Sequence, residues 1–405
     1  MPELNKIVVI GAGQAGISAV SKLRALGFTG DVTLIGEEPE LPYQRPPLTK
    51  KFLLGELPRE RLYIKPAAFY QDQNIKTISG VRVEAIAPED KSLVLSNGEK
   101  CDWDKLIVTT GSLPLSLPAS FQPVPSSVQM IRSLADIDKL QPRFLENKHL
   151  LVVGGGYIGL EIAAVASSCG LKVTLVELQD RLLKRVAAAE TATYFHDLHE
   201  GHGVNIRTST SLTALEEADD DKLVAKFDDG SSSTVDLIVL GIGIRPNVAL
   251  AESAGLEIDN GICVGEFGQT SNSDIYAAGD CASFLYKGRR VRLESVQNAI
   301  DQAEKVAETI MGESSPYDPV PWFWSDQYDT KLQIAGLNTG FDRTIVRVGT
   351  HENSQSVWYY HGDQFLAVDA MNDPRSYMTG RKWLMEGKNP DADRIASGVD
   401  LKECV

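Results

Sequence analysis

The chain repeats one pattern of apolar and polar positions. Residues 7–10 (IVVI) and 150–153 (LLVV) are short apolar runs, which are typical of buried strands in a parallel sheet. Each run is followed by a Gly-rich turn, a helical stretch and a second strand. The helices are expected over residues 17–26 and 160–169, and the second strands over residues 31–35 and 172–176. Because the pattern recurs about 140 residues further on, it predicts an α/β fold with two Rossmann-like domains.

Further apolar segments complete these domains. Residues 104–111 (DKLIVTTG) and 236–247 (DLIVLGIGIRPN) each predict a strand that ends in a Gly-containing turn and crosses between the two domains. Residues 270–282 predict a short strand ending at Gly279-Asp280. Near the C-terminus, residues 344–349 and 356–360 alternate as a small antiparallel sheet does.

Both Gly-rich turns have the spacing Gly-x-Gly-x-x-Gly. The first glycine permits a tight turn, the second lets a pyrophosphate approach the backbone, and the third packs the helix against the strand. One such motif can be a plain turn, but two copies between a strand and a helix predict two dinucleotide sites. The motif residues are Gly11, Gly13 and Gly16 in the first copy and Gly154, Gly156 and Gly159 in the second.

An acidic residue follows each motif after about 20 residues, as ribose recognition requires. These acids are Glu37 and Glu177. Glu177 favours NADH, because a carboxylate repels the 2′-phosphate of NADPH. Arg181 and Arg185 lie nearby and weaken that preference; they could equally belong to a solvated helix face or clamp the NAD pyrophosphate.

Composition and charge exclude several classes of function. With 405 residues and a net charge of −15, the chain should form two or three domains and bind neither nucleic acid nor an anionic membrane. Its five cysteines include no C-x-x-C or C-x4-C pair, so we expect a reducing compartment and no redox-active disulfide. The six histidines show no metal-ligand spacing; His196 and His199 are interpreted as a polar helix end.

Location follows from two absences in the sequence. No run reaches the roughly 18 apolar residues that span a bilayer. The first predicted strand begins so close to Met1 that no secretory signal fits before it. We therefore expect a soluble, cytoplasmic protein.

Three segments carry a family resemblance: residues 41–50 (LPYQRPPLTK), 291–299 (VRLESVQNA) and 321–333 (PWFWSDQYDTKLQ). With the two dinucleotide motifs, they resemble the two-dinucleotide-binding flavoprotein reductases over nearly the whole chain. Within that superfamily they resemble the oxygenase-coupled NADH:ferredoxin reductases (putidaredoxin reductase-like), whose motif reads PY-x-RPPLSK. Thr49 replaces the serine and keeps its hydroxyl, and no thiol-relay cysteine is present.

The resemblance implies a glutathione reductase-like α/β fold, in which the first motif binds FAD and the second binds NAD(H). The FAD-binding domain would comprise residues 1–112 and 245–320. The inserted NAD-binding domain would comprise residues 113–244, and a C-terminal α+β domain residues 321–405.

The resemblance also implies the chemistry: hydride transfer from NADH to FAD, then single-electron transfer to a [2Fe-2S] ferredoxin that serves a cytochrome P450 or a ring-hydroxylating dioxygenase. The catalytic candidates are Lys50, whose ammonium would stabilise reduced flavin, and Glu161, which would balance that charge. Without the surrounding motif, Lys50 would be interpreted as a solvated loop lysine.

The cofactor ligands are assigned by the same resemblance. Val83 would contact adenine, Arg132 the flavin side, Asp280 the ribityl chain and Val296 the pyrimidine carbonyl. The FAD set is Gly11, Gly13, Ala15, Gly16, Glu37, Arg45, Lys50, Val83, Arg132, Asp280 and Val296. The NADH set is Gly154, Gly156, Ile158, Gly159, Glu161, Glu177, Arg185 and Gly243, and no metal is expected.

The partner would be an acidic ferredoxin. The reductase itself would be a monomer or a weak dimer. A local basic patch is therefore expected, and Trp324 is a candidate for the docking face. The patch candidates are Arg289, Arg290, Arg292, Lys305 and Lys331. The alternatives are a rubredoxin reductase, an NADH oxidase, a non-flavin dehydrogenase, or an apoptosis-inducing-factor-like protein in which NADH drives a binding change.

Overall fold

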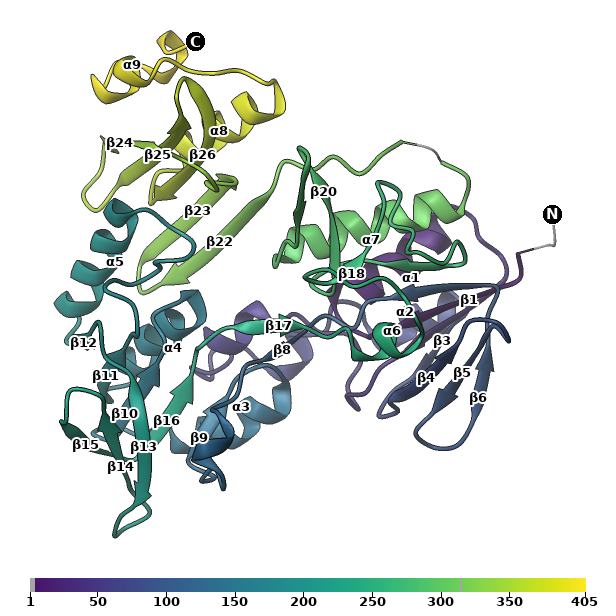
Figure 1. Cartoon of the computed structure of the whole chain (residues 1–405), viewed down its shortest axis with the longest axis horizontal. Coiled ribbons are helices and arrows are strands. Elements are labelled where there is room, and N and C mark those ends of the chain that lie inside the picture. Colours follow the sequence, from purple (N-terminus) through teal and green to yellow (C-terminus); the bar gives the residue numbers. More distant parts are fainter. Residues whose placement is uncertain (1–3, 314) are drawn as a thin grey trace. The chain divides into compact units, whose positions relative to one another are not determined.

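The computed structural model describes residues 4–313 and 315–405 and divides into two compact units (Figure 1). Unit 1 consists of Met1–Gln44, Pro58–Leu113 and Ile244–Pro319. Unit 2 consists of Arg45–Leu57, Pro114–Gly243 and Val320–Val405. The segment Arg45–Leu57 therefore belongs to unit 2, whereas the sequence analysis placed it in the FAD-binding domain; that domain assignment stays a prediction.

Unit 1 is built on a five-stranded parallel sheet, ordered β19-β7-β1-β2-β3. Each of β1 and β2 is buried along its last four residues, which explains why both read as continuous apolar runs. The strands are β1 (Lys6–Ile10), β2 (Asp31–Ile35), β3 (Ile75–Ile78), β7 (Lys105–Val108) and β19 (Ile275–Ala277).

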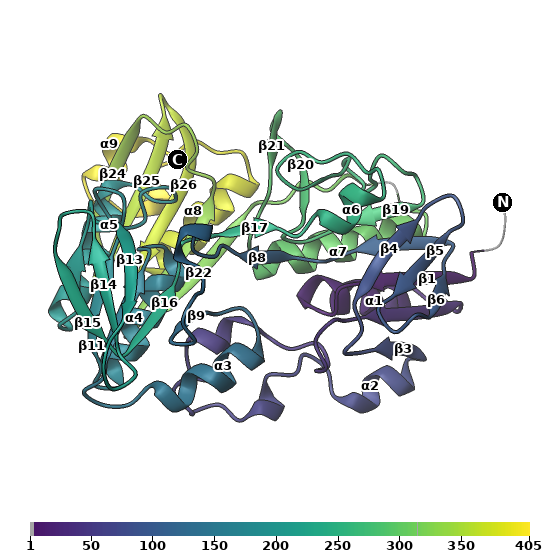
Figure 2. The same ribbon diagram turned by 60° about the horizontal axis from the view of Figure 1, so that its bottom comes forward.

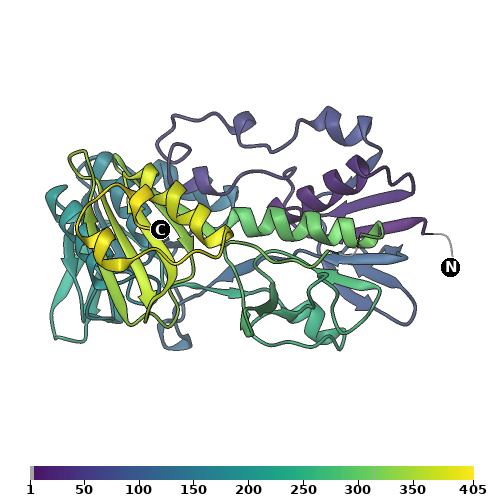
Figure 3. The same ribbon diagram turned by 90° about the horizontal axis from the view of Figure 1, so that it is seen from above.

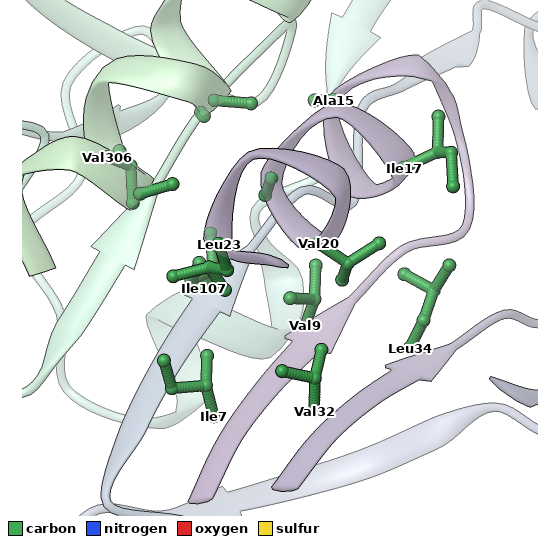
Figure 4. Close-up of a cluster of buried hydrophobic side chains, with 14 of the residues drawn as sticks. Ile7, Val9, Ala15, Ile17, Val20, Leu23, Val32, Leu34, Ile107 and Val306 are labelled. Atoms are coloured by element: carbon green, nitrogen blue, oxygen red, sulfur yellow. The ribbon is translucent and has the colours of Figure 1, made fainter. Parts of the chain in front are cut away.

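Helices α1 (Gln14–Ala25) and α7 (Val296–Ile310) pack side by side (Figure 3). Small residues of α7, among them Ala303 and Ala307, are fully buried in this core, so the two backbones can approach closely. Val20 and Val306 point into the same cluster (Figure 4). This packing fixes the start of α1, where the first glycine motif lies.

The remaining elements of unit 1 lie around this layer, and strand β8 runs across the boundary into unit 2. They include two three-stranded sheets, ordered β4-β5-β6 and β18-β20-β21. Their bounds are α2 (Ala67–Asp72), α6 (Ala249–Ser253), η2 (Arg59–Arg61), β4 (Val83–Ala87), β5 (Ser92–Leu95), β6 (Lys100–Asp102), β8 (Ser112–Pro114), β17 (Ile244–Pro246), β18 (Ile262–Cys263), β20 (Ala282–Tyr286) and β21 (Arg289–Val291).

Unit 2 repeats the parallel sheet in the order β12-β11-β10-β16-β9, and an antiparallel sheet, β13-β14-β15, accompanies it (Figure 2). The strands are β9 (Val128–Met130), β10 (His149–Val153), β11 (Lys172–Val176), β12 (Asn205–Arg207), β13 (Leu212–Glu217), β14 (Leu223–Phe227), β15 (Ser232–Val235) and β16 (Leu237–Leu240). The helices are α3 (Leu134–Leu140), α4 (Tyr157–Ser168), α5 (Ala189–Gly201), η1 (Pro46–Thr49), η3 (Ala119–Phe121) and η4 (Gln141–Arg143).

The end of the chain forms an antiparallel sheet in unit 2, ordered β22-β23-β26-β25-β24, around a core that includes Trp358 and Trp383. Helix α4 packs against both η1 and β22, so a helix of the second nucleotide fold meets a strand of the C-terminal sheet. The elements are β22 (Trp322–Gln327), β23 (Thr330–Gly336), β24 (Arg343–Val348), β25 (Gln355–His361), β26 (Gln364–Met371), α8 (Pro374–Met385), α9 (Ala392–Ala396) and η5 (Leu401–Glu403).

Candidate functional site

The first glycine motif forms the turn between β1 and α1. Gly11 has φ +107°, and a Cβ there would lie 2.1 Å from the Thr109 carbonyl oxygen. A Cβ on Gly16 would lie 2.0 Å from the Gly11 carbonyl oxygen. Gly13 differs, because no described atom outside its own neighbourhood lies within 4 Å of a Cβ built on it. The fold itself therefore requires the outer glycines, whereas the middle one leaves open backbone at a helix N-terminus, as a pyrophosphate needs.

The second motif has the same design between β10 and α4. Gly154 has φ +106°, and its Cβ would lie 2.5 Å from the Gly241 carbonyl oxygen; on Gly159 the clash would be with Gly154, at 2.0 Å. Around Gly156, again, no described atom lies within 4 Å of a built Cβ. Each unit thus offers one cradle that fits the phosphates of a dinucleotide.

The acid after each motif lies at the carboxyl end of its second strand. Glu37 is exposed and accepts two hydrogen bonds from Arg82, at 2.9 Å from Nε and 2.5 Å from Nη2. Glu177 instead closes its own glycine turn: Oε2 accepts from the Gly155 amide at 2.6 Å and Oε1 from the Gln179 amide at 2.8 Å. These bonds hold the Glu177 carboxylate beside the open glycine.

The two arginines near Glu177 have different roles. The Arg181 guanidinium donates to three backbone carbonyls, those of Leu182, Ala187 and Ala188, at 2.9 to 3.3 Å. Those bonds tie down the loop that follows β11. Arg185 is exposed, and its Nη2 lies 3.3 Å from the position of a Cβ on Gly243, which has φ +113°. Arg185 is therefore the arginine of this pair that lies beside the glycine turn following β16.

Lys50 and Glu161 meet in unit 2, as the sequence analysis expected of a charge pair. Lys50 Nζ lies 2.8 Å from Glu161 Oε2, and the Glu161 residue is only 4% exposed. Thr49 donates its hydroxyl to the same oxygen at 2.6 Å. The hydroxyl that Thr49 keeps from the serine of the family motif therefore binds the catalytic candidate Glu161.

The other oxygen of Glu161 is bound by the C-terminal sheet. Ser325 donates to Oε1 at 2.7 Å, and the Ser325 hydroxyl lies 3.2 Å from Gln327 Nε2. Gln327 Oε1 in turn lies 2.8 Å from His199 Nε2. A buried carboxylate is costly without hydrogen bonds, and Glu161 has donors on both oxygens.

The other predicted cofactor ligands lie on several different elements of the two units. Arg45 Nη1 donates to the Arg132 carbonyl at 2.5 Å, and Asp280 accepts from Ser112 at 3.0 Å. Three lie in the first turn of a helix: Ala15 in α1, Ile158 in α4 and Val296 in α7; Val83 is the buried first residue of β4.

His199 corrects the sequence analysis. It is fully buried rather than part of a polar helix end, and burial lowers its pKa to about 4. Its partner Gln327 and the neighbouring Ser325 were also missed, as was the contact made by Thr49. The spacing of Ser325 and Gln327 could have indicated that their side chains lie together, because residues two apart on a strand share a face.

The predicted basic patch is largely engaged within unit 1. Arg290 lies 3.6 Å from Asp259, Arg292 pairs with Glu294, and buried Lys305 lies 3.2 Å from Glu308. Arg289 and Lys331 are exposed. Trp324 is half-buried, with its ring centroid 5.6 Å from that of Trp322.

Metal-binding clusters and membrane-spanning helices are both absent from residues 4–313 and 315–405. No group of three His, Cys, Asp or Glu side chains is arranged to hold a metal ion. No helix there has the length and apolar character needed to cross a bilayer.

Comparison with known proteins decides the family. Residues 5–303 match the model of the pyridine nucleotide-disulphide oxidoreductases, and residues 322–405 match that of the reductase C-terminal domain. The chain belongs to the pyridine nucleotide-disulphide oxidoreductase family. Enzymes of this family use FAD and NAD(P)H, so the predicted cofactors and the α/β fold class are confirmed.

Full-length relatives narrow the branch. The reductase is 37% identical to putidaredoxin reductase of Pseudomonas putida, over 99% of this chain and 97% of that protein. It is 40% identical to the ferredoxin reductase subunit of a 5,5′-dehydrodivanillate O-demethylase of Sphingobium, over 100% and 98%. The crystal structure of the covalent putidaredoxin reductase–putidaredoxin complex matches with a TM-score of 0.94, covering 99% of this chain and 98% of that one. The predicted resemblance, enzyme class and ferredoxin-reductase function are confirmed.

Proposed function

We propose that this reductase uses NADH to reduce a [2Fe-2S] ferredoxin that serves a cytochrome P450 or a ring-hydroxylating dioxygenase. Bound FAD supplies the chemistry, since it accepts a hydride from the nicotinamide and releases the electrons singly. The observation that carries the proposal is the pair of open glycine cradles, one in each unit. The relatives named above support the choice of acceptor, because their names describe ferredoxin reductases of oxygenase systems.

We assign the FAD cradle to unit 1 and the NADH cradle to unit 2. The amides at the start of α1 would bind the FAD pyrophosphate, and Glu37 the adenosine ribose. The amides at the start of α4 would bind NADH, beside Glu177. The ligand sets and domain bounds of the sequence analysis are part of this proposal, including Val83, Arg132, Asp280 and Val296.

The proposed preference for NADH over NADPH is based on the Glu177 carboxylate and on the two arginines near it. The Glu177 carboxylate is held by two amides beside the cradle, where it repels a 2′-phosphate. Arg181, one of the two arginines that could offset this repulsion, is committed to three carbonyls. Arg185 is the remaining candidate, and we assign it to the NADH pyrophosphate.

Lys50 and Glu161 are proposed as the catalytic pair. With FAD bound, a cation beside the flavin would stabilise the negative charge that reduction brings, and we assign that role to the Lys50 ammonium. The Lys50 ammonium is held on Glu161 Oε2 at 2.8 Å and also lies 3.4 Å from the Pro46 carbonyl oxygen. The rigid Pro46–Pro47 turn that begins η1 fixes the backbone from which Lys50 extends.

The proposal extends to the ferredoxin partner, the oligomeric state of the reductase and its location in the cell. We propose a [2Fe-2S] cluster in the ferredoxin, a monomeric or weakly dimeric reductase, and a cytoplasmic location. The five free cysteines support a reducing compartment. Exposed Arg289 and Lys331 are the candidate contacts for an acidic ferredoxin.

Acceptor preference tests this proposal. Cytochrome c reduction by NADH is measured with the purified reductase and either a [2Fe-2S] ferredoxin or a rubredoxin as mediator. A rubredoxin–NAD(+) reductase of Pseudomonas putida is 34% identical, so rubredoxin is the matched alternative. We expect kcat/KM to be higher for ferredoxin, and for NADH over NADPH. Faster turnover with rubredoxin, or NADH oxidation without acceptor preference, would contradict the assignment.

A further inference from the structure

We propose that a one-way chain of hydrogen bonds, from His199 through Gln327 and Ser325, keeps Glu161 ionised and thereby holds the Lys50 ammonium in place. Ser325, Gln327 and His199 are then positioning residues, whereas Lys50 and Glu161 are the pair that acts. The inference rests on the proposed function only where it gives Lys50 a catalytic role; the ionisation of Glu161 can be tested without it.

The direction of the chain follows from the donor count. A carboxylate can only accept, so the Ser325 hydroxyl must donate to Glu161 Oε1. Its one proton is then used, so Ser325 accepts from the Gln327 amide nitrogen. That orientation turns Gln327 Oε1 towards His199, which must carry a proton on Nε2 to donate across 2.8 Å.

His199 is suited to be a fixed donor. Its lowered pKa, caused by burial, keeps the ring neutral over the working pH range. The Tyr328 hydroxyl lies 3.4 Å from Nδ1 and the Tyr328 ring packs edge-on against the imidazole. The Tyr328 hydroxyl can donate to an unprotonated Nδ1, so this contact is compatible with the Nε2 proton that the chain needs.

Burial makes the chain necessary. Ser325 and His199 are fully buried, and Gln327 and Glu161 are 1% and 4% exposed, so water does not replace a lost donor. The ionisable groups linked to Glu161 are Lys50 from the turn after η1 and, through the chain, His199 from α5. Because Gln327 cannot pass a proton on, the chain orients charge and is not a route for protons.

Ser325→Ala removes the donor to Glu161 Oε1 while leaving Lys50 and Thr49 on the other oxygen. Removing a hydrogen-bond donor from a buried carboxylate favours its neutral, protonated form. We expect the acid limb of the pH profile for NADH-dependent flavin reduction to move to higher pH. Ser356→Ala is the matched control, because Ser356 is equally buried in the same sheet and binds Ser376 and Trp358 instead.

An infrared titration of the holoenzyme provides a readout that does not depend on turnover. In Ser325→Ala, a protonated carboxyl band should appear at a pH where the wild type lacks it, and Glu161→Gln in the same background should remove it. The second substitution is required because Asp369 is another buried acid, whose pKa burial raises to about 6. If the infrared shift appears while flavin reduction is unchanged, the chain is supported and the catalytic role of Lys50 is what fails.

His199 provides a second route if Ser325→Ala does not fold. His199→Phe removes the Nε2 donor and should shift the same limb in the same direction by less than Ser325→Ala does, because the effect on Glu161 is indirect. His199→Gln keeps an N–H and should restore the profile. The proposal is overturned if Ser325→Ala and His199→Phe both match Ser356→Ala in the pH profile and in the infrared titration.

Discussion

Replacing Gly13 by alanine separates what the fold requires from what the cofactor requires. Gly13 has φ −94° and ψ −163°, an extended conformation that alanine adopts freely. Its Cβ would meet no described atom within 4 Å. Alanine is a poorer N-cap than glycine by about 0.5 to 1.5 kcal/mol, and the smaller unfolded-state entropy of the alanine variant offsets about 0.4 to 1 kcal/mol. The free energy of unfolding of the apoprotein should therefore change by less than about 1 kcal/mol.

The same methyl group would occupy the space that a pyrophosphate needs next to the backbone. Each amide-to-phosphate hydrogen bond that it lengthens contributes about 1.5 to 3 kcal/mol, which corresponds to a loss of about 10- to 100-fold in FAD affinity. Gly16→Ala is the contrasting variant, because its Cβ would lie 2.0 Å from a backbone carbonyl oxygen. We expect Gly16→Ala to lower stability in urea unfolding of the apoprotein, with loss of FAD following from that.

The assay is titration of apoprotein with FAD, followed by quenching of flavin fluorescence, alongside urea unfolding of the same samples. Gly156→Ala provides the parallel test in unit 2, where it should weaken NADH binding and leave FAD binding intact. The reasoning is refuted if Gly13→Ala binds FAD as tightly as the wild type, or if its stability falls as far as that of Gly16→Ala.

Three further predictions follow from named contacts. Burial raises the pKa of Asp369 to about 6, so its stabilisation is full below pH 4 and lost as pH rises through 6. Relative to Asp369→Asn, the wild type should lose about 3 kcal/mol of unfolding free energy between pH 4 and 7, by urea titration. Glu177→Ala should raise kcat/KM for NADPH relative to NADH by about 10-fold or more in steady-state assays, since it removes a charge that repels the 2′-phosphate. Ferredoxin turnover should fall as salt is raised, and Arg289→Ala should weaken that dependence; a flat response would exclude electrostatic docking.

The sequence predicted the bounds of a strand or helix well where the residues of that element alone determine them. Strands at residues 31–35 and 172–176 match β2 and β11 at both ends, because each is a buried run that begins with an exposed charged residue and is followed within two residues by a glutamate. The two motif helices begin three residues earlier than predicted, at Gln14 and Tyr157. The reason is that the middle glycine serves as N-cap, so the third glycine lies within the first turn.

Contacts over long sequence separations were predicted only where a motif specified them. Lys50 and Glu161 were paired by the resemblance, and they do meet. The chain from Glu161 to His199 joins α4, β22 and α5, and no periodicity shows that three such elements come together. His199 was misread for the same reason, since its polar neighbours in the sequence lie on the exposed side of α5 and its own partner lies 128 residues away.

The most direct test of the account is anaerobic electron transfer from the NADH-reduced holoenzyme to a purified [2Fe-2S] ferredoxin, followed by the visible spectra of both proteins. The account predicts a yellow protein that bleaches with NADH, regains its oxidised spectrum on adding ferredoxin, and reduces two ferredoxins for each NADH consumed. A protein that stays colourless after reconstitution with FAD would contradict the central claim. So would one that bleaches with NADH and leaves the ferredoxin oxidised.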